Sequence, residues 1–267
     1  MKGIIILFIV AMLVSSIGWK RFVYFISLGY GFSVSACAIA IAIIYRQVLT
    51  LPTALLCAVL YVYGIRLGGY LLVREIKSAS YRKALAENVN EGTYPFGVTM
   101  AIWVSCAILY VAEVSPVAFR LDNMAKGLPT GLHWAWVGLV VMVLGIIVES
   151  VADLQKSAAK KVNPNRFVNS GLYRMVRCPN YFGEMLTWTG CLLVCFGASC
   201  NVWQWVLAIF GYVGIVYVMF SGARRLEIRQ NKHYGNDPEY QAYVKKTPIL
   251  IPLVPIYSVE RHEWLRG

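Results

Sequence analysis

The chain has 267 residues, of which 58% are hydrophobic and 14% charged, with a mean hydropathy of +0.60 and a formal net charge of +12. Soluble domains carry about 25% charged residues, so this composition excludes a globular protein with a water-solvated surface. No linker, low-complexity tract or internal repeat divides the chain. We therefore expect a single all-α, polytopic membrane domain over residues 1–267, with no nucleic-acid partner.

Helices that cross a bilayer need roughly 20 apolar residues, and the sequence contains seven such runs. The runs cover residues 3–18, 22–45, 51–73, 95–113, 132–152, 181–200 and 202–221. The first run also resembles a signal peptide, because Lys2 precedes a short apolar stretch. The basic flank Trp19-Lys20-Arg21 favours a retained helix instead. The pattern predicts about seven transmembrane helices.

The distribution of Lys and Arg predicts the orientation of these helices. With the N-terminus outside, the inner segments hold 20 basic residues and the outer segments hold 4. Cytoplasmic loops carry such an excess, so we expect the charged loops and the C-terminal tail in the cytoplasm. The inner segments are 19–21, 74–94, 153–180 and 222–267, and the outer basic residues are Lys2, Arg46, Arg120 and Lys126.

Arg66 stands inside the third run, where an ionised side chain costs about 2.5–3.5 kcal/mol. Tyr63, Arg66, Tyr70 and Arg74 are spaced by three or four residues and therefore share one helix face. Lipid cannot solvate that face. The face therefore forms either an interhelical structural network or the wall of a polar site.

A second polar face follows the fifth run. Glu149, Asp153, Lys156 and Lys160 are spaced by four, three and four residues, so two carboxylates and two ammonium groups share a face. Either they form ion pairs on an exposed helix end or they line a site. Glu184, near the inner end of the sixth run, adds a carboxylate at membrane depth.

The segment before the sixth run suits an anion. Pro179 fits the first turn of a helix, where its missing N–H has no partner anyway. The N–H groups of that turn face the cytoplasm with Arg174 and Arg177 beside them, an arrangement that can hold a phosphate. Alternatively, the two arginines only mark the inner side of the membrane.

The tail predicts further helix on the cytoplasmic side. Segment 222–234 continues the last run, and Asp237-Pro238 begins a short helix in which Tyr240 and Tyr243 share a face. Alternatively, the tail packs on the membrane surface. Nucleotide, zinc and hydrolase motifs are absent, so no metal site is expected. The residues alone indicate a membrane enzyme or transporter whose basic inner mouth suits a polyanionic cofactor.

The second half of the chain resembles the steroid 5α-reductase superfamily, in particular its bacterial membrane reductases. The match covers roughly residues 145–255 in the order and spacing of the family. A weaker match, Tyr63-x-x-Arg66-x-x-x-Tyr70, is similar to the family's substrate-site helix. The matching segments are Glu149 to Lys156, Gly171 to Arg174, Arg177 to Glu184, Ser221 to Glu227, Asp237 to Tyr240 and Lys245 to Pro248.

The resemblance implies an enzyme of lipid metabolism in a bacterial inner membrane. It would transfer a hydride from NADPH to a carbon–carbon double bond conjugated to a carbonyl in a lipophilic, steroid-like substrate. Residues 1–144 would form the substrate-side helices, where Tyr63 hydrogen-bonds the substrate carbonyl beside Arg66, and residues 145–257 would bind the cofactor. The implied cofactor contacts are Glu149, Asp153, Lys156, Lys160, Arg174, Arg177, Asn180, Tyr181, Glu184, Glu227 and Tyr240.

Two positions depart from the family pattern. Residues 22–45 contain no Glu or Gln, where steroid reductases of the family carry a Gln-Glu pair, and Cys178 replaces the His of an Arg-His-Pro-Asn-Tyr motif. The alternatives are a membrane methyltransferase of the isoprenylcysteine or phospholipid type, which uses S-adenosylmethionine, and a non-catalytic lipid-binding protein. Membrane lipid and a lipophilic small molecule are the expected partners.

Overall fold

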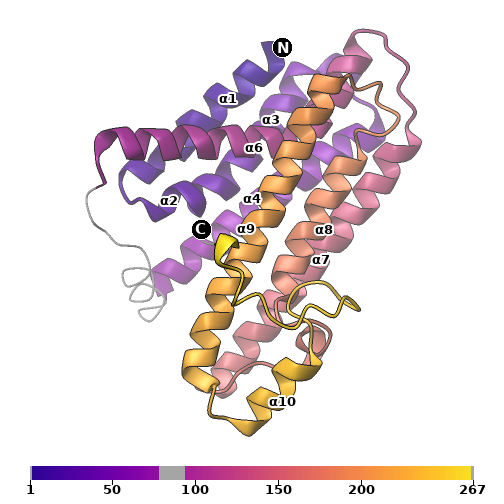
Figure 1. The fold of residues 1–267 in the computed structure, drawn as a ribbon. Helices are drawn as coiled ribbons and strands as arrows, with labels where there is room; N and C mark the ends of the chain where they lie inside the picture. The colour runs from indigo at the N-terminus through magenta and orange to yellow at the C-terminus, as the bar shows by residue number, and fades with distance from the viewer. Residues whose placement is uncertain (1, 78–93, 266–267) are drawn as a thin grey trace. The chain divides into compact units, whose positions relative to one another are not determined.

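The computed structural model describes residues 2–77 and 94–265, and within these ranges its regular elements are all helices (Figure 1). Five of the described helices are long and apolar enough to cross a membrane. The all-α, polytopic fold is therefore confirmed, and the helices indicate an integral membrane protein. The count of seven spans, the orientation and the bacterial inner membrane stay predictions.

Each of the seven predicted runs lies on helix, although the ends differ. The inner segment expected at 74–94 lies mostly outside the described residues. The longer helices are α1 (Lys2–Ser15, continued by the 3-10 turn η1, Ser16–Trp19), α4 (Leu51–Lys77), α6 (Phe96–Ala125), α7 (His133–Val162) and α9 (Val202–Tyr234). The shorter elements are α2 (Val23–Ile26), α3 (Leu28–Ile44), η2 (Arg46–Val48), η3 (Gly171–Arg174), α8 (Pro179–Leu193), α10 (Pro238–Lys246) and η4 (Glu263–Leu265).

The chain forms two compact units built from interleaved segments. Unit 1 contains Met1–Leu139 and Gly190–Tyr212, and unit 2 contains Val140–Thr189 and Val213–Gly267. Helices α7, α8 and α9 each contribute residues to both units.

In unit 1, α3 and α4 pack with their backbones close together. A Cβ on Gly31 would lie 2.7 Å from the backbone nitrogen of Gly68 and 2.9 Å from the carbonyl oxygen of Gly64. Small residues let helix backbones approach in this way inside a membrane. The approach carries the Tyr63 face of α4 against α3.

Helix α6 extends about three turns beyond the end predicted for its run, and this corrects the placement of Arg120. Pro116 leaves the carbonyl of Ala112 without its helical N–H, but the Ser115 hydroxyl donates to that carbonyl at 2.7 Å, so the helix continues. Arg120 was expected in an outer segment but is fully buried in α6. Its guanidinium donates to the carbonyls of Val194, Gly131 and Phe196 at 3.0, 2.8 and 2.9 Å.

In unit 2, the C-terminal tail returns along α9 after α10 (Figure 1). The Asp237 side chain caps α10 by accepting the N–H of Glu239, as Asp237-Pro238 predicts. Further along, Arg224 donates to the Glu260 carbonyl at 2.9 Å and Ser221 donates to the Leu265 carbonyl at 3.1 Å. The predicted continuation of the last run through residues 222–234 is therefore confirmed as helix, and the tail packs on it.

Candidate functional site

A close approach of α7 and α8 brings two carboxylates onto adjoining helices of unit 2. A Cβ on Gly183 would lie 2.6 Å from the backbone nitrogen of Glu149 and 2.7 Å from the carbonyl oxygen of Gly145. Only glycine fits at such a distance, because any side chain at 183 would push the helices apart. Glu149 and Glu184 are both buried beside this contact. Acidic side chains buried in membrane proteins are usually functional, so this contact is a candidate site.

The other members of the predicted α7 face lie further along the same helix. Asp153 is buried, and Lys156 is partly buried. Lys160 donates to the carbonyls of Pro164 and Arg166 at 3.0 and 2.7 Å and to the Tyr234 hydroxyl at 3.0 Å. Lys160 therefore fixes the loop after α7, whereas Asp153 and Lys156 stay nearer to the carboxylates of the α7–α8 contact.

The loop that leads into α8 is anchored to α7. The Leu172 N–H donates to the Gln155 side chain at 2.9 Å. Gly171 has a φ of +59°, which glycine adopts at no steric cost, and a Cβ there would meet the Gln155 amide. The sequence Gly171 to Arg174 thus forms η3, and Arg174 at its end is exposed. Helix α8 begins at Pro179, as predicted, with Asn180 and Tyr181 in its first turn.

Arg177 and Glu227 form a buried ion pair that ties this loop to α9. The guanidinium donates to the Glu227 carboxylate at 2.7 Å, and the two side chains are 2% and 3% exposed. The same nitrogen donates to the Tyr257 carbonyl at 2.5 Å, and the other Glu227 oxygen accepts the Val259 N–H at 2.8 Å. The pair therefore holds the tail in place, and Arg177 is engaged within the protein.

Cys178, at the position where relatives have His, is a buried neutral thiol. Its N–H donates to the Ile249 carbonyl at 2.9 Å, and the side chain is almost fully buried. Burial raises the pKa of the Cys178 thiol to about 12. The thiol is therefore held in its protonated form at physiological pH.

Basic residues of α9 lie near the first turn of α8. A Cβ on Gly222 would lie 3.3 Å from the Tyr181 ring, so the two helices meet at this point. Arg225 and Arg229 lie on the face of α9 that meets Tyr181 at Gly222. The two arginines are not among the residues that the sequence motifs indicated for the site. Their spacing of three and then four residues from Gly222 is the signal that could have found them, since it places all three on one face of α9.

Tyr240 lies in an aromatic cluster on α10. Its hydroxyl donates to the Asn231 side chain at 2.7 Å, and Tyr243 donates to the Tyr173 carbonyl at 2.7 Å. Both rings contact Phe167, with centroids 5.3 and 5.5 Å away, so the prediction that Tyr240 and Tyr243 share a face is confirmed. Burial raises the pKa of Tyr240 to about 12.

The donor set of unit 2 fits a phosphate-bearing dinucleotide. Arg225 and Arg229 supply positive charge next to the N-terminus of α8, where backbone N–H groups favour an anion. The carboxylates of Glu149 and Glu184 can accept from ribose hydroxyls or an amide. All eleven residues predicted to contact the cofactor fall in unit 2, although their roles stay predictions.

In unit 1, the side chain of Tyr63 faces another tyrosine. The hydroxyls of Tyr63 and Tyr30 are 3.0 Å apart, and both side chains are buried between α3 and α4. The Tyr30 ring also contacts the Tyr110 ring of α6 at a centroid distance of 5.2 Å. Arg66, one turn beyond Tyr63, is partly buried. The sequence analysis missed Tyr30, because a tyrosine in an apolar run carries no signal of its own.

The fold defines a polytopic helical membrane protein, and its unit 2 contains buried charged side chains. The chain belongs to the family described as "Protein of unknown function (DUF1295)", whose model matches residues 13–247. No solved structure matches the chain significantly.

Two curated relatives connect the chain with a known activity. The chain is 24% identical to "Steroid 5-alpha-reductase DET2" of Arabidopsis thaliana over 129 residues, which is 46% of this chain and 44% of the relative. It is 35% identical to the protein of the same name from Gossypium hirsutum over 71 residues, which is 26% of this chain and 25% of the relative. The matches thus span less than half of each relative. They confirm the resemblance to the steroid 5α-reductase superfamily and suggest a membrane reductase.

Proposed function

We propose that the protein is an NADPH-dependent reductase of a carbon–carbon double bond conjugated to a carbonyl in a lipophilic substrate. The observation that carries the proposal is a set of five buried Asp, Glu and Arg side chains in unit 2, all of them within the segments that resemble the reductases. Burying charged groups away from water is costly unless they are paired or serve a site. The five are Glu149, Asp153, Arg177, Glu184 and Glu227.

The residues of unit 2 divide into binding groups and framework groups in this proposal. Arg225, Arg229 and the first turn of α8 at Asn180 bind phosphate, while Glu149 and Glu184 orient the nicotinamide half through hydrogen bonds. Arg177 with Glu227, and Tyr240 with Asn231, hold the surrounding loop and tail. NADPH, when bound, supplies the hydride.

Tyr63 is the proposed donor to the substrate oxygen. Hydride addition at the carbon β to the carbonyl moves an electron pair onto that oxygen, and a proton then reaches the α carbon to give the saturated ketone. A hydroxyl already aimed at the oxygen stabilises this charge more than it stabilises the ground state. Because Tyr30 lies 3.0 Å from Tyr63, it can donate to the Tyr63 oxygen while Tyr63 donates to the substrate.

The cofactor half of the proposal is tested by titrating NADPH into the purified full chain and following nucleotide fluorescence. We expect saturable binding, weakened at least about tenfold by Asn180→Ala, because the first turn of α8 loses a polar contact. The matched control is Asn165→Ala, an exposed asparagine in the loop after α7. Saturable binding of S-adenosylmethionine without NADPH binding would move the assignment to the methyltransferases. Binding of neither would leave a lipid-binding protein.

The catalytic half is tested by single-turnover NADPH oxidation with an enone substrate. Tyr63→Phe should keep NADPH affinity and lose about 10²–10³ in rate, the usual cost of one such donor. Tyr61→Phe is the matched control, because Tyr61 lies on the same helix but is 41% exposed. A Tyr63→Phe protein that turns over near the wild-type rate would exclude Tyr63 as the donor.

A further inference from the structure

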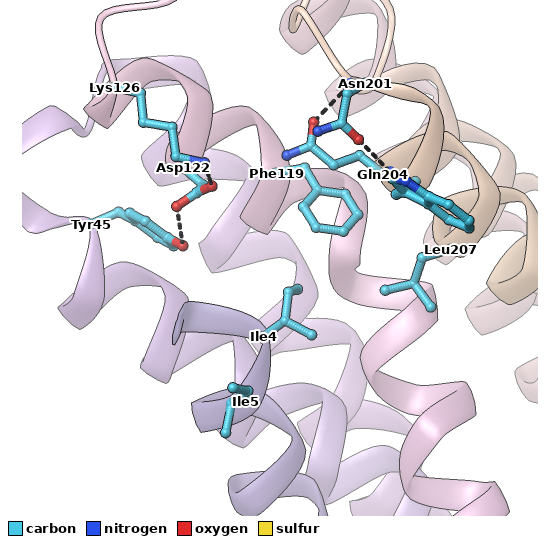
Figure 2. A pocket seen from close by; sticks show the side chains of 10 residues that line it. Ile4, Ile5, Tyr45, Phe119, Asp122, Lys126, Asn201, Gln204 and Leu207 are labelled. Carbon is cyan, nitrogen blue, oxygen red and sulfur yellow. Dashed lines mark hydrogen bonds and ion pairs between the residues drawn. The ribbon is translucent and has the colours of Figure 1, made fainter. Parts of the chain in front are cut away.

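Unit 1 contains a cavity of about 370 Å³ that the proposed reductase function does not use. Figure 2 shows its walls, which come from α1, from the residue after α3, and from the end of α6 and the start of α9. Ligand pockets typically have volumes of this order. The lining residues are Ile4, Ile5, Tyr45, Phe119, Asp122, Lys126, Asn201, Trp203, Gln204 and Leu207.

The cavity lies at the ends of membrane-length helices. Helix α1 begins at Lys2, α6 ends at Ala125 and α9 begins at Val202, and all three ends border it. Trp203, at the start of α9, is 80% exposed. Exposed tryptophan is enriched at the level of the lipid headgroups. The cavity therefore sits at the interface between the hydrocarbon core and water, where headgroups and the first part of acyl chains are found.

The lining separates into an apolar part and a polar part. In Figure 2 the side chains of Ile4 and Ile5 lie on α1, apart from Asp122 and Lys126, and Leu207 lies across the cavity on α9. Apolar atoms dominate the lining, so a purely polar ligand does not fit. The occupant must be amphipathic, with a hydrocarbon chain against the isoleucines and leucine.

The polar groups that line the cavity differ in the hydrogen-bonding capacity that remains after their contacts within the protein. Asn201 and Gln204 satisfy each other in a capping box, in which each side chain accepts the backbone N–H of the other at 3.0 Å. The Tyr45 hydroxyl donates to Asp122 at 3.3 Å. The Lys126 ammonium also pairs with Asp122, which takes one of its three donors. Lys126 is therefore the group best able to hold a negatively charged headgroup.

We propose that this cavity binds one glycerophospholipid, with the phosphate at Lys126 and an acyl chain along Ile4 and Leu207. The Lys126 ammonium supports a phospholipid over an uncharged lipid, because its two remaining N–H donors can bond phosphate oxygens. The apolar wall supports a lipid over free phosphate. The proposal is independent of the reductase function, since the cavity shares no residue with the groups assigned to catalysis or cofactor binding.

The test uses the full chain in nanodiscs that contain phosphatidylethanolamine with a photoreactive diazirine on one acyl chain. After irradiation, the labelled peptides are mapped by mass spectrometry. We expect labelling to concentrate on the peptides that contain Ile4 and Leu207, above the level at Leu13, which is 68% exposed on α1 outside the cavity. Uniform labelling of all lipid-facing helices would overturn the proposal.

Two pairs of variants separate a specific site from general lipid contact. Lys126→Gln should lower cavity labelling about threefold, the worth of one exposed ion pair, whereas Arg46→Gln, an exposed basic residue in η2, should leave it unchanged. Leu207→Trp should fill the cavity and remove the labelling. Val206→Trp, the neighbouring exposed position outside the lining, should not.

The identity of the headgroup is tested by a diacylglycerol carrying the same diazirine chain. We expect it to label the cavity peptides at least threefold less than phosphatidylethanolamine does, because it lacks the phosphate. Equal labelling by both probes, together with no effect of Lys126→Gln, would overturn the role of the phosphate. Displacement of the lipid by added inorganic phosphate would show an anion site in place of a lipid site.

Discussion

Replacing Arg177 by Met removes the guanidinium that neutralises the buried carboxylate of Glu227. The two side chains are 2% and 3% exposed and lie 2.7 Å apart, so water cannot take the place of the lost partner. Removing one member of a buried ion pair costs about 3–5 kcal/mol, because the other charge stays buried and uncompensated. The Tyr257 carbonyl loses its 2.5 Å hydrogen bond in the same change.

Hydrogen exchange of the tail measures this cost directly. Val259 donates its N–H to Glu227, so its protection reports whether the tail stays docked. A loss of 3–5 kcal/mol corresponds to roughly 10²–10⁴-fold faster exchange, up to the limit set by global unfolding. The double variant Arg177→Met/Glu227→Leu should recover most of the protection, because a well-packed apolar pair can replace a buried ion pair.

A matched control lies in the same unit. Arg166 and Glu239 form an ion pair at 2.5 Å whose side chains are 49% and 64% exposed. Because water screens this pair, Arg166→Gln should change stability by at most about 1 kcal/mol. If exchange at Val259 in the Arg177→Met protein is less than tenfold faster, the ion pair does not hold the tail in place. Arg177 would then be available for the phosphate-binding role that the sequence suggests.

Three further predictions concern the packing, the pH response and the orientation. Gly183→Ala should destabilise unit 2 by about 1–3 kcal/mol in thermal unfolding and weaken NADPH binding, because the new Cβ would lie 2.6 Å from the α7 backbone. The control is Gly69→Ala, where a Cβ meets nothing within 4 Å, and it should have neither effect. The pKa of Tyr240 is raised to about 12, which means that folding favours the neutral hydroxyl. The stability that this hydroxyl contributes is complete below about pH 10 and is lost as the pH rises toward 12. Limited proteolysis of the tail should therefore accelerate in that window in the wild type but not in Tyr240→Phe, and identical profiles would contradict this. Reporter fusions after residues 165 and 267 should both report cytoplasm, and a periplasmic signal from either would reverse the predicted orientation.

The sequence by itself determined the helical class and most helix positions. Apolar runs must be helical in a bilayer, because only a helix satisfies every backbone group within one segment. Local chemistry also marked the starts of α8 and α10, since Pro179 and Asp237 act within one helical turn. The motif order in the second half likewise indicated the superfamily before the fold was considered.

Tertiary structure alone decided which polar groups meet. Arg120 seemed to belong to an outer loop, yet carbonyls of residues 74 and 76 positions away in the chain enclose its guanidinium. Tyr30 and Tyr63 are 33 positions apart, and Arg177 and Glu227 are 50 apart. Hydrophobic periodicity describes one helix at a time. It therefore predicts which face of a helix is polar, but not which other part of the chain that face contacts. The free energy of a buried charge depends on that partner, and for this reason the partners had to come from the fold.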